Sequence, residues 1–178
     1  MIIETKFVLH SEKVLLRQFV ETDIDENYIG WLNDQDVVRF SNQRFLKHDH
    51  KSCLHYLTTF DGTNNLFISV RGLADDSALG TMTAYVSDHH GTVDVGIMIG
   101  DKSVWGQGYG QDAWNTLTNW LLERDDIRKI TAGTLACNTS MIKLMERSGM
   151  HHEATRKAQE KVNEEIVDIL YYAKFSEK

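Results

Sequence analysis

Three glycines within five residues constrain this chain more than any other feature of its sequence. Gly106, Gly108 and Gly110 follow an apolar run at 93–99 and precede a run of helical periodicity. This order predicts a strand, a glycine-rich loop and a helix. Glycine lets several backbone N–H groups converge on one point, and the positive end of the following helix faces the same point. The loop therefore indicates a phosphate-binding site.

Two common phosphate-binding motifs do not fit this loop. A P-loop requires Gly-x-x-x-x-Gly-Lys followed by Ser or Thr, and that pattern is absent. A dinucleotide-binding loop requires G-x-G-x-x-G, whereas the spacing found is G-x-G-x-G. For the glycine spacing considered alone, a tight strand–helix turn without a ligand remains an alternative.

Size and composition exclude several classes of protein. A chain of 178 residues suits one domain over 1–178. No apolar run is long enough to span a bilayer and the first residues lack a signal pattern, so we expect no membrane partner. The net charge of −7 argues against a nucleic-acid partner and favours an amine substrate, although solubility explains it equally well. Cys53 and Cys137 resemble isolated reduced thiols, which favours a cytoplasmic location.

Apolar periodicity predicts an alternation of strands and helices. The predicted strands are 14–17, 66–70, 81–86, 93–99, 130–137 and a C-terminal hairpin of 154–158 and 166–175 with its turn near Asn163. The predicted helices are one capped by Thr22, one over 49–57, one directly after the glycines, and one over 139–148 that ends at Gly149. Strands first, followed by alternating strands and helices, indicate an α+β or α/β domain with a mixed sheet.

Two motifs, correctly spaced, resemble those of a known family. Residues 105–110 resemble motif A of the GNAT N-acetyltransferases, with Gly108 and Gly110 at its two small positions. Trp105 departs from the usual Gln or Arg and is similar to the RimJ/RimL-type branch, which is named for ribosomal-protein N-terminal acetyltransferases. Residues 138–150 resemble motif B. Segments 95–100, 16–17 and 31–34 also fit this branch, so the likeness covers nearly the whole chain.

The resemblance implies a fold and an activity. The fold would be α+β (α/β-like), a single GNAT-type domain with a central, mixed, mostly antiparallel twisted sheet, a splayed strand pair and flanking helices. The activity would be transfer of an acetyl group from the cosubstrate acetyl-CoA to a primary amine by direct attack in a ternary complex. A protein N-terminus, a polyamine and an amino sugar all remain open as acceptors. Family members also pair in several ways, so we allow for a homodimer.

The resemblance also assigns contacts with coenzyme A. The backbone of Met98 and Ile99 would pair with pantetheine as an added strand does, and one N–H there would polarise the thioester carbonyl. Backbone N–H groups of 107–111 would bind the pyrophosphate, and the Asn138 amide would hold the pantetheine arm. Lys143 and Arg147 would approach phosphates, unless they form a solvated helix face. The complete predicted set is Ile97, Met98, Ile99, Trp105, Gly106, Gln107, Gly108, Tyr109, Gly110, Gln111, Asn138 and Lys143.

Two proton transfers need candidate groups. The amine must be neutral to attack, so a base or a water path is required. The resemblance implies Asp94 as the candidate base, because this branch often has an acid near that point, and Asp94 shares a strand face with Gly96 and Met98. A solvent-facing carboxylate is the alternative. Many relatives protonate the leaving thiolate with a motif-B Tyr, but Met145 occupies that position and cannot donate. Tyr109 is the substitute acid; otherwise coenzyme A leaves as a thiolate.

The acceptor side gives the weakest sequence signal. By resemblance, Tyr28, Trp31, Phe40 and Arg44 are the candidate substrate-binding residues, although Tyr28 and Trp31 fit a core equally well. The 48–50 segment contains His and Asp but no further ligand cluster, so we predict a helix entry and no metal site. A CoA-binding regulatory protein without catalysis is the alternative function, and Met145 supports it.

Overall fold

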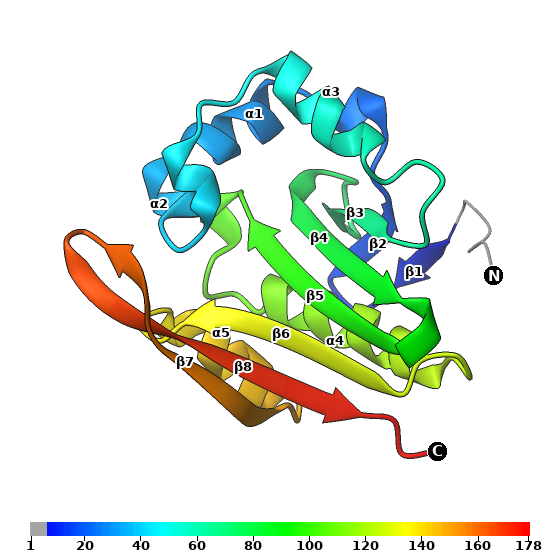
Figure 1. Ribbon diagram of the computed structural model, residues 1–178. Helices are drawn as coiled ribbons and strands as arrows, with labels where there is room; N and C mark the ends of the chain where they lie inside the picture. Colours follow the sequence, from blue (N-terminus) through cyan, green and yellow to red (C-terminus); the bar gives the residue numbers. More distant parts are fainter. Residues whose placement is uncertain (1–6) are drawn as a thin grey trace.

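One eight-stranded sheet organises residues 7–178, which are the residues that the computed structural model describes (Figure 1). The strands are β1 Val8–His10, β2 Val14–Gln18, β3 Leu66–Gly72, β4 Ala78–Ser87, β5 Thr92–Ile99, β6 Lys129–Leu135, β7 His151–Val162 and β8 Glu165–Phe175. Their spatial order is β1-β2-β3-β4-β5-β6-β8-β7, and every neighbouring pair is antiparallel except β5 and β6. The predicted mixed, mostly antiparallel sheet is therefore confirmed.

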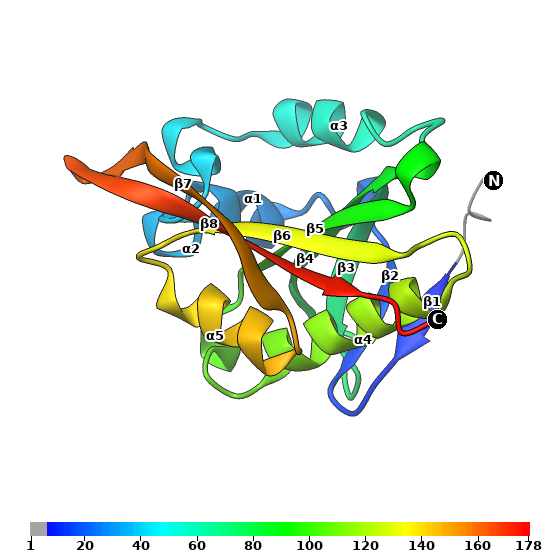
Figure 2. The ribbon, with the colours of Figure 1, turned by 60° about the horizontal axis from the view of Figure 1, so that its bottom comes forward.

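Five α-helices cover the two faces of this sheet. They are α1 Glu26–Asn33, α2 Gln35–Val38, α3 His50–Thr58, α4 Tyr109–Glu123 and α5 Thr139–Arg147. Figure 2 shows α3 on one side of the sheet and α4 and α5 on the other. The apolar face of α4 buries Trp114 and Leu117 completely, while Tyr28 of α1 packs with Phe67 of β3 in a second core. The alternation of side chains along the strands supplies both cores from one sheet.

Local capping chemistry explains where most helices begin and end. Asp49 caps α3 by accepting a hydrogen bond from the Ser52 N–H at 2.8 Å, in agreement with the predicted start of that helix. Gly149 has a φ of +78° directly after the α5 C-cap, as expected for a residue that terminates a helix.

The predicted cap of the first helix was wrong. Asp25, and not Thr22, caps α1 by accepting from the Tyr28 N–H at 2.8 Å. Thr22 lies within a 3₁₀ turn, Glu21–Asp23, which Arg17 holds through a two-pronged contact with the Asp23 carboxylate. This ion pair joins β2 to the turn, and the α-helix begins after it. No helix within residues 7–178 is long and apolar enough to cross a membrane.

The parallel strands β5 and β6 separate after a short pairing. Thr92–Asp94 pair with Lys129–Thr131, and beyond this point β5 is bonded only to β4 and β6 only to β8. The connection between them passes through the glycine loop and α4, as a parallel pair requires. The predicted splayed strand pair is therefore present, and it opens one edge of β5 next to the loop.

Candidate active site

A cleft of about 1030 Å³ occupies the gap between the separated strands. One wall, the loop side, consists of the lining residues from 104 to 111 and from 133 to 147. The opposite wall, the helix side, consists of the lining residues from 28 to 56, contributed by α1, α2, α3 and the segment between α2 and α3. Lining residues of β3, β4 and β5 lie between the two walls. The volume lies at the upper end of the range of ordinary ligand pockets, about 300–1,000 Å³.

The loop side presents a row of free backbone donors. Gly106 and Gly108 have φ values of +74° and +87°, a conformation that a side chain would strain. The first helical bond of α4 joins the Asp112 N–H to the Gly108 carbonyl at 2.9 Å. The four N–H groups of residues 108–111 have no acceptor within the described part of the chain. Together with the helix dipole they form a site for an anion.

Gln107 contributes less to this donor row than the sequence predicted. Its N–H makes a long turn bond to the Val104 carbonyl at 3.3 Å, and its side-chain amide donates to the Ser103 carbonyl at 2.6 Å. Gln107 does not line the cleft. The predicted N–H set of 107–111 therefore narrows to 108–111.

Trp105 ties the loop to the end of β5. Its indole Nε1–H donates to the Ile99 carbonyl at 2.8 Å, while its ring is 44% exposed and lines the cleft. An aliphatic or phenyl side chain at this position could not make the bond, because it has no donor. The residue that departs from the general motif thus has a positioning role.

Strand alternation decides which β5 groups face the gap. The Ile99 carbonyl points away from β4, since Trp105 reaches it, whereas the Met98 carbonyl lies against Gly80 of β4. Main-chain groups of alternate residues point the same way, so those of Ile97 face the gap together with those of Ile99. The backbone role expected of Met98 therefore belongs to Ile97, while the Met98 side chain still lines the cleft.

Two cations lie near the loop, and one of them was missed. The Lys13 ammonium lies 5.3 Å from the centre of the Tyr109 ring, and the Lys13 side chain passes beside Gly108. Arg147 of α5 lines the cleft, whereas Lys143 is exposed and does not line it. Nothing in the sequence around Lys13 indicates this position, because β2 and α4 meet only in the folded chain.

Asn138 has a local bonding pattern that fixes its side chain. Its oxygen accepts from the Met141 N–H at 3.3 Å and so caps α5, and its NH₂ group donates to the Thr134 hydroxyl at 3.1 Å. Asn138 lines the cleft, and its second N–H remains for a ligand. Gln111 also lines the cleft and donates to the Leu144 carbonyl at 3.2 Å.

The candidate base Asp94 lies on the sheet face that carries the helix side, but outside the cleft lining. Its carboxylate accepts from the Thr131 hydroxyl at 2.8 Å. Desolvation by the surrounding protein raises the pKa of Asp94, and the hydrogen bond from Thr131 opposes this change. Because Asp94 is exposed, solvent limits the pKa shift.

A pair of tyrosine hydroxyls connects the cleft wall with the neighbour of Asp94. Tyr56 lines the cleft, and its hydroxyl lies 2.7 Å from that of Tyr85. Tyr85 is the cross-strand partner of Asp94 and is 43% exposed. Burial and then the hydrogen bond with Tyr85 raise the pKa of Tyr56, so the Tyr56 hydroxyl holds its proton at neutral pH. The sequence did not indicate this pair.

Tyr109, the candidate acid predicted from the sequence, lies away from the cleft lining. The Tyr109 ring lies beside Lys13 and packs against the α4 core, and it does not line the cleft. Met145, at the family's tyrosine position, is fully buried in that core. Neither residue presents a hydroxyl to the cleft.

The predicted acceptor residues divide into two groups. Tyr28 and Phe40 line the cleft, whereas Trp31 packs against the backbone at Gly100. Arg44 also lies outside the lining: its guanidinium donates to the Lys161 carbonyl at 3.1 Å and so joins the α2–α3 connection to β7. The structure adds lining residues that the sequence did not assign to the acceptor, among them His48, Cys53 and Tyr56. Within residues 7–178, no group of three or more His, Cys, Asp or Glu could hold a metal ion.

Comparisons with known proteins agree with this geometry. Residues 13–151 match the family model described as an acetyltransferase (GNAT) domain. None of the curated proteins that were compared with the chain matches it.

Several solved structures share the fold at low sequence identity. A GNAT-family acetyltransferase from Bacillus anthracis has a TM-score of 0.81 at 20% identity, covering 97% of this chain and 100% of its own. Spermidine N-acetyltransferase from Vibrio cholerae, in complex with CoA and spermine, has a TM-score of 0.84 at 14% identity, covering 94% and 98%. The RimL acetyltransferase of ribosomal L7/L12, in complex with coenzyme A, has a TM-score of 0.83 at 15% identity, covering 95% and 98%.

Proposed function

Because the chain belongs to the GNAT acetyltransferase family, we propose that it transfers an acetyl group from acetyl-CoA to a primary amine. The observation that carries this proposal is the row of four free N–H groups at residues 108–111, directly beside the open edge of β5. The free N–H groups suit a pyrophosphate, and the open edge of β5 suits the amide-containing pantetheine chain. The two features are continuous along one cleft, as one molecule of coenzyme A requires.

In this proposal the loop side holds coenzyme A. The N–H groups of residues 108–111 bind the pyrophosphate, and Lys13 and Arg147 add positive charge at its two sides. The main chain of Ile97 and Ile99 pairs with pantetheine, and an N–H group on this edge stabilises the negative charge that develops on the thioester oxygen. The free N–H of Asn138 holds the same arm from α5.

In this proposal the amine loses its proton through the paired hydroxyls of Tyr56 and Tyr85. The ammonium gives a proton to the Tyr56 oxygen, Tyr56 passes its own proton to Tyr85, and Tyr85 releases one to solvent or to the adjacent Asp94 carboxylate. Neither tyrosine changes charge in this transfer, which fits the raised pKa of Tyr56. The neutral amine then attacks the thioester carbon, its nitrogen forms the amide bond, and the C–S bond breaks so that coenzyme A leaves as the thiolate. The second proton of the amine nitrogen is lost as the amide forms and passes to the thiolate or to solvent.

The alternative function is a CoA-binding regulatory protein without catalysis. The buried position of Met145 favours it, since no hydroxyl replaces the usual tyrosine there. Calorimetry with acetyl-CoA, followed by a thiol-release assay with a panel of amines, distinguishes the two. Saturable binding with amine-dependent release supports the enzyme, and binding without release for any amine supports the regulatory protein. Absence of binding excludes both.

We place the chain in the RimJ/RimL-type branch, with Trp105 as the supporting residue. A small-molecule or peptide amine is the proposed partner, and the net charge of −7 supports the absence of a nucleic-acid partner. The free thiols Cys53 and Cys137 support a cytoplasmic location. The edge strand β7 offers unpaired main-chain groups through which a homodimer could form.

A further inference from the structure

We infer that the acceptor is a monoamine carried on an apolar, preferably aromatic, body. This inference rests on the proposed acetyltransferase function and concerns the helix side of the cleft. Its evidence is the chemistry of that wall: aromatic and aliphatic side chains form most of the surface, charges are few, and most hydroxyls are already bonded within the protein.

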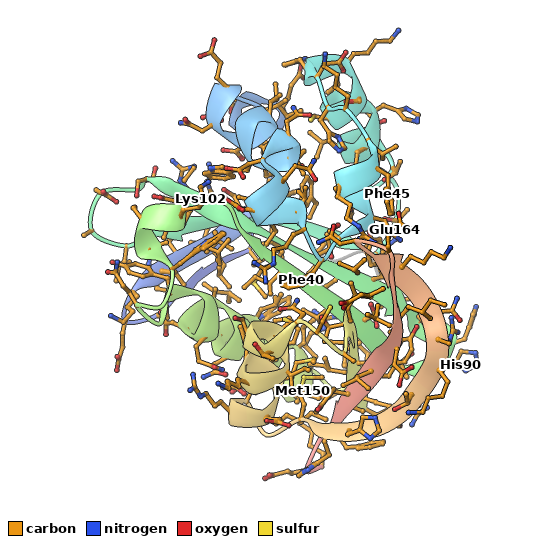
Figure 3. The ribbon with its side chains drawn as sticks, turned by 90° about the vertical axis from the view of Figure 1, so that its left-hand side faces the viewer. Phe40, Phe45, His90, Lys102, Met150 and Glu164 are labelled. Atoms are coloured by element: carbon orange, nitrogen blue, oxygen red, sulfur yellow. The ribbon has the colours of Figure 1, made fainter. Side chains whose placement is uncertain are left out.

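Aromatic and aliphatic side chains form the base and rim of the helix side. Tyr28 and Phe67 are each 4% exposed and pack against each other with their ring centres 6.3 Å apart. Phe40 and Leu46 stand at the rim, and Leu46 is 60% exposed although it lines the cleft. Figure 3 shows Phe40 between the layer of α1 and α3 and the layer of α4 and α5. An apolar body gains free energy by covering these surfaces, and an aromatic ring can also pack face to edge.

The charges of the cleft disfavour a polycation. Its lining contains one carboxylate, Asp36, and two guanidinium groups, Arg39 and Arg147. The Asp36 carboxylate already lies 3.4 Å from the Lys102 ammonium. A polyamine needs a carboxylate for each additional ammonium group, because an unpaired charge near a low-dielectric wall is unfavourable. The net negative charge of the chain therefore does not come from residues that line this cleft.

Three of the four hydroxyl side chains of the helix side, Ser41, Ser52 and Tyr56, are bonded within the protein, which disfavours an amino sugar. The Ser52 hydroxyl donates to the Asp49 carbonyl at 3.0 Å, the Ser41 hydroxyl accepts from the Gln43 N–H at 3.2 Å, and the Tyr56 hydroxyl pairs with Tyr85. Several sugar hydroxyls would lose water against Phe40 and Leu46 without gaining partners.

His48 adds a buried polar atom without a partner to the residues of this wall. Within residues 7–178, the His48 Nε2 is the sole buried side-chain nitrogen or oxygen without a hydrogen-bond partner. The Asn33 side chain fixes the His48 backbone, because it accepts from the N–H and donates to the carbonyl, both at 2.9 Å. A buried polar atom without a partner is unfavourable unless a ligand supplies one. A single polar contact fits a body with one polar substituent.

The test compares amines that differ only in their body. Thiol release is measured with 2-phenylethylamine, 2-(4-hydroxyphenyl)ethylamine, spermidine, glucosamine, and short peptides that begin with Phe or with Ser. We expect kcat/KM for the two arylalkylamines or the Phe peptide to exceed that for spermidine and glucosamine by about 10-fold or more. The small amines test whether a free arylalkylamine is the acceptor, and the peptides test whether an aromatic residue at a peptide N-terminus is the acceptor. Preference for spermidine, glucosamine or the Ser peptide overturns the inference.

Phe40→Ala and Phe45→Ala form a matched pair of variants. Phe40 lines the cleft, whereas the nearby Phe45 is 69% exposed and does not line it. We expect Phe40→Ala to raise the KM for 2-phenylethylamine about 10-fold, Phe40→Leu to restore much of the loss, and Phe45→Ala to change little. Equal effects of both alanine variants overturn the inference. His48→Leu should reduce the advantage of the hydroxylated amine over 2-phenylethylamine.

Binding separates this inference from the proposed function. The affinity of 2-phenylethylamine and of spermidine is measured by calorimetry on the protein saturated with coenzyme A. Preferential binding of 2-phenylethylamine without turnover would contradict the enzymatic function but support the chemistry of the wall. Turnover together with preferential binding of spermidine would support the enzyme and overturn the inference.

Discussion

The two walls of the cleft are built in different ways. The loop side presents mainly backbone groups that lie close together in the sequence, at residues 108–111 and along the edge of β5. The helix side presents side chains from α1, α2, α3 and the connection before α3, brought together by packing on β3. A backbone site depends on conformation and tolerates exchange of most side chains, whereas a side-chain site changes with each substitution. The comparison teaches why the donor of the reaction can be recognised more easily than the acceptor.

The largest test of this comparison targets the backbone of the loop. Gly108→Asp places a carboxylate beside the pyrophosphate position, and at an effective dielectric constant of 20 two like charges about 5 Å apart repel by about 3 kcal/mol. We therefore expect the Kd for acetyl-CoA to rise about 100-fold or more, measured by calorimetry.

Gly62→Asp is the matched control for that variant. Gly62 also has a left-handed φ, +69°, but it lies in the connection between α3 and β3 and does not line the cleft. It carries the same backbone strain and added charge without approaching the loop. Unchanged acetyl-CoA binding in a folded Gly108→Asp protein would show that the loop is not the pyrophosphate site.

A second test concerns Asp94 of β5 and its cross-strand partner Tyr85 of β4. If Asp94 receives the proton that Tyr85 releases, activity requires the Asp94 carboxylate. Desolvation raises the pKa of Asp94, so this activity is present above the raised pKa and is lost as the pH falls through it. We expect Asp94→Asn to lower kcat about 10-fold near neutral pH and to remove the acidic limb of the kcat–pH profile, with a smaller effect on acetyl-CoA binding.

Tyr85→Phe provides the comparison for the Asp94 variant. It removes the hydroxyl that is bonded to Tyr56 on the cross-strand partner of Asp94, but retains the ring that stacks on Phe60. If Tyr85 and Asp94 act in the same proton path, we expect Tyr85→Phe and Asp94→Asn to have similar kcat values. A wild-type kcat–pH profile in both variants would exclude the path.

The third test returns to the loop side and concerns the tether from Trp105. Trp105→Phe keeps an aromatic ring but removes the indole donor to the Ile99 carbonyl. One such bond contributes about 1 kcal/mol, so we expect about a 5-fold weaker affinity for acetyl-CoA and an unchanged preference among amines. A changed amine preference with unaltered acetyl-CoA affinity would contradict the assignment of Trp105 to the loop side.

The smallest expected effect concerns the base of the helix side. Asp25→Ala should lower the free energy of unfolding by about 1 kcal/mol, measured with urea, because it removes the cap of α1. Thr22→Ala should change it little, since Thr22 provides no cap to that helix. A larger loss of stability in Thr22→Ala than in Asp25→Ala would support the helix start at Thr22 that the sequence predicted.

Sequence and structure agreed where the information is local. The helix near 49–57, the helix end at Gly149 and the apolar stripe of α4 were predicted from the sequence pattern, because each depends on residues within a few positions of one another. The backbone role of Met98 was misassigned by one residue, since the direction of main-chain groups depends on pairing with β4. Tyr56, Tyr85 and His48 were missed because no short pattern connects residues of different elements.

The sequence by itself determined the family, the mixed sheet and the position of the glycine loop between β5 and α4. These depend on short-range backbone preferences and on the periodicity of apolar residues, which are present in the chain before it folds. Only the tertiary structure decided that Lys13 lies beside the loop, that Arg44 joins β7, and that the helix side is apolar and sparsely charged. Those contacts join residues distant in sequence, and their geometry is fixed only when both cores pack against the sheet.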